Sequence, residues 1–315
     1  MSTSNMVVNP SPVSGANKVA YKGKSKRSFK RMLVVFSFLA PALILYILFM
    51  LYPMADAVRL SFFDWDGAAP AMNFVGGDNY TQLAQDPIFI KSLVNNFYWV
   101  LLSLLLMILP TLALSVLIGK LKRGKMFFRA GFYLPSVLSL AVIGVLWSKI
   151  YDPNYGAINV FLRQVGLGAL AQNWLGEPSV VIPALVVTST WAFYGTYMVL
   201  FLAGLQNIDQ SMYEAADIDG AGPIRKFWNI TVPSLRNTMN VVVSMVVIHA
   251  LKGFGLVWIM TQGGPFYKSE VVATYVYKAA FSMNKVSYAS AGSVVLGIIV
   301  IGLTIAFNYW RDKGE

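Results

Sequence analysis

A chain of 315 residues with 57% hydrophobic and only 12% charged side chains is not an ordinary soluble domain, in which about 25% of the residues are charged. The mean hydropathy of +0.59 also indicates a membrane protein. The absence of cysteine excludes disulfides and Cys-based metal sites. The net charge of +11 would suit nucleic acid. The basic residues lie beside apolar segments, however, so membrane orientation explains them and we expect no nucleic-acid partner.

The N-terminal segment 1–31 is basic and polar. It contains seven Lys or Arg residues and no Asp or Glu, so we expect a disordered cytoplasmic segment. A basic stretch before an apolar one is also typical of a secretion signal. The apolar run from Met32 to Pro53 exceeds the roughly 7–15 residues of a signal's hydrophobic region, and no small-x-small cleavage site follows it. We therefore interpret this run as a retained first span.

Six apolar segments are long enough to cross the hydrocarbon core, which takes about 20 residues. They cover roughly residues 32–53, 93–119, 130–150, 180–203, 239–260 and 290–310. Tyr and Trp stand at several of their ends, as in the aromatic belts of membrane proteins. These patterns predict an all-α integral membrane protein, with a six-helix transmembrane domain over residues 32–310 and a short cytoplasmic tail, 311–315.

The charges of the connecting loops predict the orientation of the spans. Loop 120–129 has five basic residues and no acid, whereas loop 54–92 has five acids and two basic residues. Basic loops stay in the cytoplasm. Both termini and the loops 120–129 and 204–238 are therefore expected inside, and the loops 54–92, 151–179 and 261–289 outside. The last of these carries three lysines, so the rule holds on balance and not in every loop.

Residues 209–233, between the fourth and fifth spans, do not resemble a lipid-facing helix. The block Glu-Ala-Ala that starts at Glu214 favours a helix, which the Gly-Ala-Gly-Pro sequence ending at Pro223 interrupts. Pro223 suits the first position of a second helix, and Pro233 closes it before the next span. Two short helices joined by a sharp bend predict a docking element. An amphipathic linker is the alternative, but a linker would need neither the bend nor the closing proline.

The Glu-Ala-Ala block, with nine residues between Gly220 and an Ile230-x-x-Pro233 ending, resembles the EAA loop of binding-protein-dependent ABC importers. Further motifs resemble the permease subunits that import sugars, oligosaccharides and glycerol phosphates. They include Phe-Val-Gly-x-x-Asn-Tyr ending at Tyr80 and Thr-Gln-Gly-Gly-Pro ending at Pro265, and the similarity runs from about residue 32 to 310. The chain departs from this family at Gly255, where an acid is frequent, and lacks the maltose subunit's large outer domain.

The resemblance implies a type I importer-like permease bundle with cytoplasmic coupling helices, in a bacterial-type cytoplasmic membrane. Its implied partners are a homologous second permease subunit, two cytoplasmic ATPase subunits that hold ATP and Mg, and an extracytoplasmic solute-binding protein. This chain would then bind no cofactor and catalyse no reaction itself. The residues assigned in this way to ATPase coupling are Glu214, Ala215, Ala216, Asp219, Gly220, Gly222, Pro223, Phe227 and Pro233.

One further motif, Gly119-Lys-Leu-Lys-Arg-Gly124-Lys125-Met126, nearly matches a phosphate-binding P-loop. Met126 replaces the Ser or Thr that would hold magnesium, and no strand is expected before the motif. We therefore interpret it as a tight basic turn between the second and third spans.

Spans four and five carry the candidate substrate path, which consists of Trp191, Tyr194, Thr196, Tyr197, His249 and Lys252. Aromatic faces stack on the CH faces of sugars, and hydroxyls orient them by hydrogen bonds. Lys252 follows His249 by three residues on one helix face, and ionisable groups inside a span usually face the bundle interior or an aqueous path. Packing without a substrate role is the alternative for both groups. The spacing of His249 and Lys252 does not support a metal site.

The main alternative function is an ion-coupled secondary transporter. Such folds usually show internal repeats, interrupted helices and intramembrane charges. In this sequence no repeat is visible and the predicted spans contain no acid beside His249 and Lys252. A membrane-bound enzyme would need a nucleophile–base pair or a metal cluster, which one histidine does not supply. The sequence thus favours the importer permease without singling out one carbohydrate.

Overall fold

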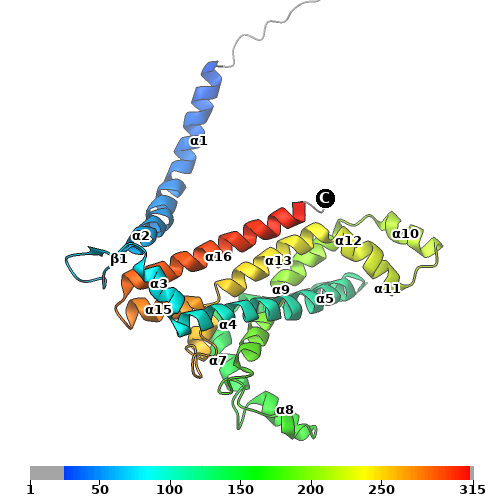
Figure 1. Ribbon diagram of the computed structural model, residues 1–315. Coiled ribbons are helices and arrows are strands. Elements are labelled where there is room, and N and C mark those ends of the chain that lie inside the picture. The colour runs from blue at the N-terminus through cyan, green and yellow to red at the C-terminus, as the bar shows by residue number, and fades with distance from the viewer. Residues whose placement is uncertain (1–24, 122, 313–315) are drawn as a thin grey trace, which may run out of the picture. The chain divides into compact units, whose positions relative to one another are not determined.

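A computed structural model describes residues 25–121 and 123–312, most of them in helices (Figure 1). The chain divides into two compact units, Met1–Ala55 and Asp56–Glu315. Residues 1–24, where we expect most of the N-terminal disorder, and residues 313–315 of the predicted tail lie outside the described part.

The described part of the first unit is one continuous helix. Helix α1 (Ser25–Tyr46) continues through the π-helical turn η1 (Ile47–Leu51) into α2 (Tyr52–Leu60), which extends into the second unit. The helix therefore begins before the predicted span at residue 32 and includes residues 25–31 of the basic segment. Its apolar part, Met32–Leu60, is long enough to cross a membrane, and none of its most apolar window is buried.

The second unit begins with a small hairpin and a bundle of helices. Strands β1 (Phe63–Asp64) and β2 (Asn73–Phe74) are antiparallel, with Phe63 opposite Phe74. The helices that follow are α3 (Asp78–Gln85), α4 (Pro87–Ser103), η2 (Leu104–Ile108), α5 (Leu109–Gly119), α6 (Lys125–Tyr133), η3 (Leu134–Val137), α7 (Leu140–Ile150), α8 (Ala157–Gln164), η4 (Gly168–Leu170) and α9 (Val181–Gln206). The remaining elements are α10 (Gln210–Ile218), α11 (Pro223–Lys226), η5 (Phe227–Thr231), α12 (Val232–Ser234), α13 (Arg236–Leu251), α14 (Gly255–Met260), α15 (Val272–Phe281) and α16 (Val286–Asp312).

Three predicted spans of this unit are confirmed as long helices. Pro87–Gly119, Val181–Gln206 and Val286–Phe307 are each long and apolar enough to cross a membrane. In the first of them α4 passes through the π-helical turn η2 into α5 without a break, so Pro110 does not end the helix. The π-helical turn η2 is the kind of local adjustment that accommodates proline within a membrane helix.

The other two predicted spans are interrupted. Segment 130–150 divides at Leu138, which is extended, and the helices on either side are bent by 98°. The second helix starts after its N-cap Ser139, whose hydroxyl accepts a hydrogen bond from Val142 N at 3.3 Å. Pro135 lies in the short helix η3 before the break. Segment 239–260 divides after Leu251 into α13 and α14. The other helix pair with a comparable bend is Pro223–Ser234 with Arg236–Leu251, at 72°. Counting each bent pair as one span gives up to six spans in the described residues.

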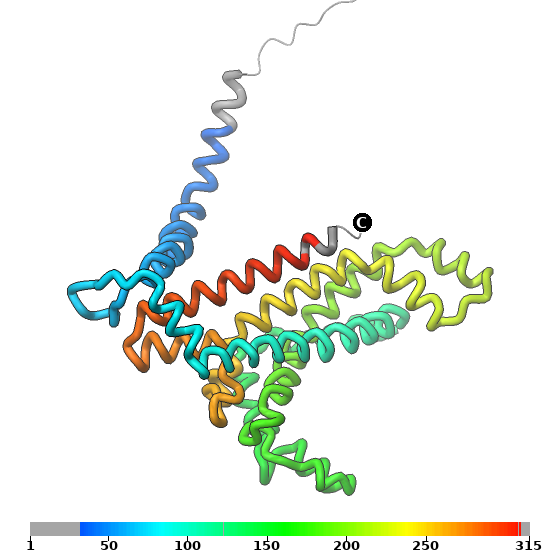
Figure 2. The backbone as a smooth tube through the Cα atoms, viewed as in Figure 1, coloured from blue at the N-terminus to red at the C-terminus, as the bar shows by residue number. Residues whose placement is uncertain are grey.

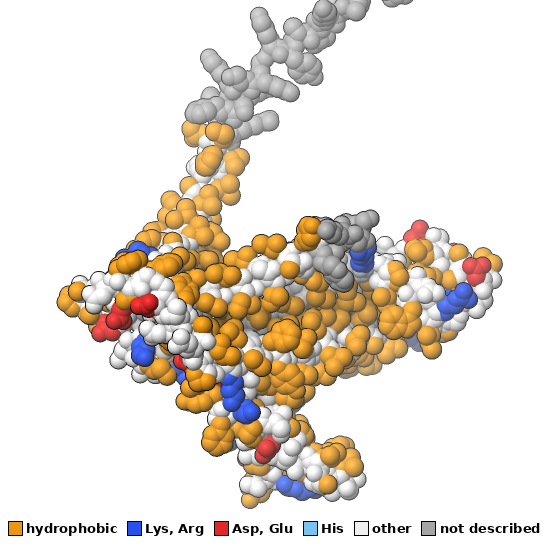
Figure 3. Space-filling model, viewed as in Figure 1, with side chains coloured by type: hydrophobic (Ala, Val, Ile, Leu, Met, Phe, Trp, Pro, Cys, Tyr) orange, Lys and Arg blue, Asp and Glu red, His pale blue; other side chains and the backbone are white. Residues whose placement is uncertain are grey.

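Helix α9 forms the centre of the second unit. Its buried side chains include Leu185, Val186, Tyr197 and Phe201, all fully buried, and they pack against α4, η2, α5 and α13. Figures 1 and 2 show α4–α5, α9, α13 and α16 side by side, with α10 and α11 at one end. In Figure 3 the face of this bundle is mostly hydrophobic and charged side chains gather toward its ends, as expected for a bundle in a bilayer.

Candidate coupling site and substrate path

The coupling segment, residues 209–234, begins with a well-capped helix. Asp209 is the N-cap of α10, and its carboxylate accepts a hydrogen bond from Ser211 N at 2.9 Å. This backbone hydrogen bond, together with the Ser211 hydroxyl, lowers the pKa of Asp209 and keeps it ionised at the positive end of the helix dipole. Glu214 and Ala215 of the Glu-Ala-Ala block are exposed on this helix, and Ala216 is partly buried.

The predicted sharp bend is confirmed at Gly220. Its φ of +70° is in the left-handed region, and an added Cβ would meet no atom within 4 Å, so the backbone conformation alone requires glycine there. Gly220 N donates to Asp217 O at 3.1 Å, and Ala221 N donates to Ala216 O at 2.8 Å. These two bonds form a Schellman motif, which ends α10 after Ile218.

The second half of the segment restarts at Pro223, which is the first residue of α11 with Gly222 as its N-cap. The helix continues through the π-helical turn η5 to α12, which contains Pro233, and the chain then turns by 72° into α13. The prediction of two short helices is therefore confirmed. Pro233 lies two residues before the turn at Leu235 rather than at the break itself.

Two side-chain contacts, here called the brace, connect the halves of the coupling segment. The hydroxyls of Tyr213 on α10 and Thr231 on η5 lie 2.9 Å apart. Lys226 forms an ion pair with Asp217. Because both contacts cross the bend at Gly220, they favour one angle between the two helices.

The segment presents a large apolar surface. Ile218 is 88% exposed, Ile224 77% and Trp228 59%. Exposed apolar groups of this size on one short segment mark an interaction surface. Phe227 is different, because it packs back onto the bundle against the cluster around Phe201 and Leu235. The side chains of Ile218, Ile224 and Trp228 are thus free for a partner. Ile218 was not predicted, although it directly follows the Glu-Ala-Ala-Asp stretch.

The candidate substrate residues divide into two groups. In the first, Tyr197 Oη and His249 Nδ1 lie 2.7 Å apart across the α9–α13 interface, and the Phe193 ring stacks on His249 with centroids 5.1 Å apart. The structure thus joins spans four and five as predicted. Tyr197 is fully buried, however, so its aromatic face is not available to a sugar.

The second group faces α6 and α7. Trp191 and Tyr194 line a hollow of about 710 Å³ with Trp147 and Thr190. Tyr194 Oη donates to Pro110 O at 3.1 Å, and the rings of Trp191 and Trp147 lie 5.7 Å apart. Of the two tyrosines, only Tyr197 therefore hydrogen-bonds to His249, whereas Tyr194 contacts α5.

Two further predicted residues occupy other positions. Lys252 is exposed at the C-cap of α13, at the break before α14. A basic group there is favourable at the negative end of the helix dipole. Thr196 is partly buried on α9. Directly before Thr196, Gly195 allows a close approach of α9 to the 130–137 segment, because an added Cβ would lie 2.5 Å from Phe132 O.

The predicted outer loop 261–289 contains a buried ion pair that no sequence pattern indicated. Glu270 is fully buried, and its carboxylate lies 2.5 Å from Lys278 Nζ, which also donates to Gln262 O at 2.7 Å. Asn95 on α4 donates to Glu270 O at 2.8 Å. The three lysines of this loop weakened the charge bias, and Glu270 pairs with one of them. The pair lies outside the spans.

The near match to a P-loop has the predicted structure. Gly124, with a φ of +76°, is the N-cap of α6, and the motif follows helix α5. The segment before it is not a strand, so the arrangement that places phosphates on a strand–loop–helix is absent from these described residues.

The structure thus defines a helical membrane protein with an exposed segment between two apolar helices. The family model for binding-protein-dependent transport system inner membrane components matches residues 13–313. The probable ABC transporter permease protein YurN of Bacillus subtilis is 37% identical over 275 residues, covering 87% of this chain and 94% of that protein. The diacetylchitobiose uptake system permease protein NgcF of Streptomyces coelicolor is 33% identical, covering 93% of this chain and 87% of that protein.

Solved structures agree on the fold. A chain of a bacterial ABC transporter involved in the import of the acidic polysaccharide alginate superposes with a TM-score of 0.79 at 23% identity, covering 91% of this chain and 98% of that chain. The chain described here belongs to the family of binding-protein-dependent transport system inner membrane components, and it is an integral membrane permease subunit. This membership decides against the ion-coupled secondary transporter.

Proposed function

We propose that this chain is one permease subunit of an ATP-driven importer for a sugar, oligosaccharide or related carbohydrate. The similarity to NgcF supports this substrate class, as does a sn-glycerol-3-phosphate transport system permease protein of Brucella abortus that is 31% identical over 90% of this chain and 96% of that protein. A multiple sugar-binding transport system permease protein of Streptococcus mutans is also 31% identical.

The exposed coupling segment is the observation that supports ATP-driven transport. A separate ATPase subunit on each permease would seat α10 and α11 in a cleft, with Ile218, Ile224 and Trp228 buried in the contact. Glu214 would offer its carboxylate to a basic group of the ATPase. The brace lets the segment move as one body, so closure of an ATPase dimer would be transmitted to α9 and α13 as a rigid-body switch. ATP and magnesium would reside on those partners.

The assembly would contain a homologous second permease subunit and an extracytoplasmic solute-binding protein. The complex of the alginate transporter with a pentasaccharide-bound periplasmic protein is a structural neighbour, with a TM-score of 0.78. We place the chain in a bacterial-type cytoplasmic membrane with both termini and the coupling segment inside, because the basic loop 120–129 and the coupling segment lie at the same end of the bundle.

The substrate path of this proposal includes His249 with Phe193 at the α9–α13 interface, and the aromatic hollow with Trp191 and Tyr194 on the other face of α9. Tyr197 would position His249 through their hydrogen bond and, because it is fully buried, would not contact the sugar. A mainly hydrophobic site discriminates weakly between sugars, so selectivity would rest chiefly on the solute-binding protein.

The test is reconstitution of the complex with Glu214→Lys or Gly220→Pro in this chain. Either variant should lose solute uptake in proteoliposomes and should retain less ATPase subunit during size-exclusion chromatography, since one reverses a docking charge and the other removes the Gly220 N–H and the left-handed turn.

Matched controls are available in the predicted outer loop 151–179. Glu177 is an exposed acid, and Gly166 has a φ of +79° and donates its N–H to Arg163 O, as Gly220 does to Asp217 O. Glu177→Lys and Gly166→Pro should retain the ATPase subunit. A Gly220→Pro complex that assembles fully and transports normally would reduce the segment to a linker.

A further inference from the structure

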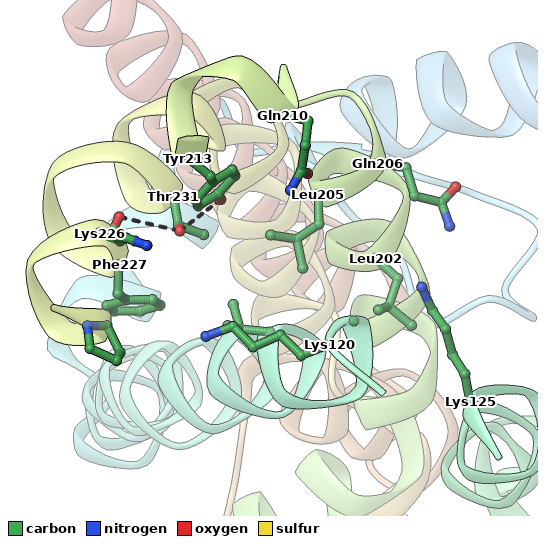
Figure 4. A pocket seen from close by; sticks show the side chains of 13 residues that line it. Lys120, Lys125, Leu202, Leu205, Gln206, Gln210, Tyr213, Lys226, Phe227 and Thr231 are labelled. Carbon is green, nitrogen blue, oxygen red and sulfur yellow. Dashed lines mark hydrogen bonds between the residues drawn. The ribbon is translucent and has the colours of Figure 1, made fainter. Parts of the chain in front are cut away.

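A cavity of about 350 Å³ lies between the coupling segment and the bundle (Figure 4). Its walls come from the end of α5, the start of α6, the end of α9, and both halves of the coupling segment. This volume is within the roughly 300–1,000 Å³ of small-molecule sites. Because the apolar helices Pro87–Gly119 and Val181–Gln206 both end beside it, the cavity lies where a span leaves the hydrocarbon core.

The polar lining of the cavity is strongly basic. Lys120, Lys125 and Lys226 line it, and no Asp or Glu among the described residues does. Figure 4 shows the ammonium groups of Lys120 and Lys226 turned toward the same side of the cavity, while Lys125 extends toward the end of α9. Lys226 is paired with Asp217, whose carboxylate is not part of the lining. Lys120 and Lys125 form no ion pair within the described residues.

Neutral donors and an apolar floor complete the site. The amides of Gln206 and Gln210 reach the cavity from α9 and α10, and the floor consists of Val116, Leu202 and Leu205 with Phe227. An amide NH₂ supplies two donors and an ammonium three. A basic rim above an apolar floor suits a ligand with an anionic oxygen-rich group, and metal cations are excluded by the three positive charges.

We propose that this cavity binds a phosphate group and that the bound group connects the coupling segment to the ends of α5 and α6. Lysines bind phosphate as point charges, and charge-assisted hydrogen bonds are about twice as strong as neutral ones. The occupant would relieve the mutual repulsion of the lysines. It would also hold Lys226, and with it α11, against Lys120 and Lys125, which belong to elements outside the coupling segment.

The phosphate comes either from an anionic lipid headgroup or from a soluble phosphate. Each lysine near an anionic membrane surface contributes about 1 kcal/mol, a factor of about five in binding. Replacing Lys120 and Lys125 together by Gln should therefore weaken binding about 25-fold. Neither residue belongs to the proposed ATPase contact.

Binding is measured first on the full purified chain in non-ionic detergent by native mass spectrometry. Phosphatidylglycerol, phosphatidylcholine and inorganic phosphate serve as separate probes. We expect the wild type to retain phosphatidylglycerol or inorganic phosphate, and the Lys120→Gln/Lys125→Gln variant to lose it. Arg123→Gln is the matched control, because Arg123 is an exposed cation of the same loop that does not line the cavity.

The outcomes separate the two sources. Retention of phosphatidylglycerol alone identifies a lipid headgroup site, and retention of inorganic phosphate alone identifies a soluble ligand. Equal retention by the wild type and the double variant, equal losses in the double variant and Arg123→Gln, or no retention of either probe would overturn the proposal. This readout needs neither ATPase nor transport, so its failure is distinct from a failure of the importer assignment.

Discussion

The carboxylate of Asp86 connects three helices at the end of the bundle that faces outside in the predicted topology. One oxygen accepts from Ile88 N at 2.8 Å as the N-cap of α4. The other accepts from Tyr275 of α15 at 2.5 Å and Tyr288 of α16 at 3.1 Å. Burial acts to raise the pKa of Asp86, but the hydrogen bonds from Tyr275, Phe89 N, Ile88 N and Tyr288 outweigh it and lower the pKa.

Replacing Asp86 by Ala should destabilise the protein by about 1–3 kcal/mol, because a cap is lost and two part-buried hydroxyls lose their carboxylate acceptor. Because the folded pKa is depressed, this stabilisation is complete above the unfolded value of about 3.9 and is lost as pH falls through the folded pKa. Thermal unfolding followed by tryptophan fluorescence should show a difference at pH 7 that shrinks below pH 4. Asp66→Ala is the control, since Asp66 accepts only from Ala68 and Ala69 in its own turn. Equal midpoints for Asp86→Ala and the wild type at pH 7 would contradict the role of Asp86.

The pair Tyr197–His249 calls for two different substitutions. Tyr197→Ala removes a fully buried ring and should cost about 3–5 kcal/mol, so the protein should lose its fold before any transport effect is measurable. Tyr197→Phe keeps the ring and removes only the hydroxyl that lies 2.7 Å from His249 Nδ1.

Tyr197→Phe and His249→Ala should therefore fold, assemble and hydrolyse ATP at the basal rate while taking up less solute. Tyr194→Ala tests the aromatic hollow in the same way, and uptake by proteoliposomes is the measurement. Normal uptake by all three variants would place the path elsewhere, chiefly in the partner permease.

At the scale of elements, the brace determines whether the coupling segment moves as one body. Tyr213→Phe removes only the hydroxyl that meets Thr231 at 2.9 Å, a bond of about 1 kcal/mol. A more flexible segment should transmit less of the ATPase motion, so more ATP should be hydrolysed per solute imported.

The ratio of hydrolysis to uptake measures this effect. Tyr155→Phe serves as the comparison, because Tyr155 is 88% exposed and its hydroxyl has no hydrogen bond within the described residues. A ratio that is the same in both variants would mean that the Asp217–Lys226 contact alone maintains the angle.

Local sequence signals predicted the coupling segment well, because glycine and proline act over a few residues. Gly220 has the left-handed φ, and Pro223 starts a helix. Hydropathy predicted where the apolar segments lie but not where they bend, since averaging over about 20 residues hides a break such as that at Leu138. Helix geometry places Tyr194 and Tyr197 as neighbours, because they are three residues apart. That their hydroxyls contact different helices depends on the packing of the whole bundle.

At the scale of the whole molecule, the distribution of charge and the position of the coupling segment are independent indications of sidedness. The lysines of the α5–α6 turn and the coupling segment line one cavity, so both belong on one side of the membrane. The acidic loop before α4 lies at the other end of the bundle (Figure 1). Because positively charged loops are retained inside, we expect the cavity to face the cytoplasm.

The chain has no cysteine, so single cysteines can test this orientation in the native background. Arg123→Cys and Gly222→Cys should resist a membrane-impermeant thiol reagent in intact cells, and Asp78→Cys, at the exposed start of α3, should react. Permeabilised cells should label all three, which controls for accessibility of the thiols. Labelling at position 123 from outside would reverse the topology and remove the coupling segment from any cytoplasmic ATPase. Labelling from outside at position 222 alone would mean that the two loops lie on opposite sides of the membrane. Their shared cavity forbids this, so we expect positions 123 and 222 to give the same result.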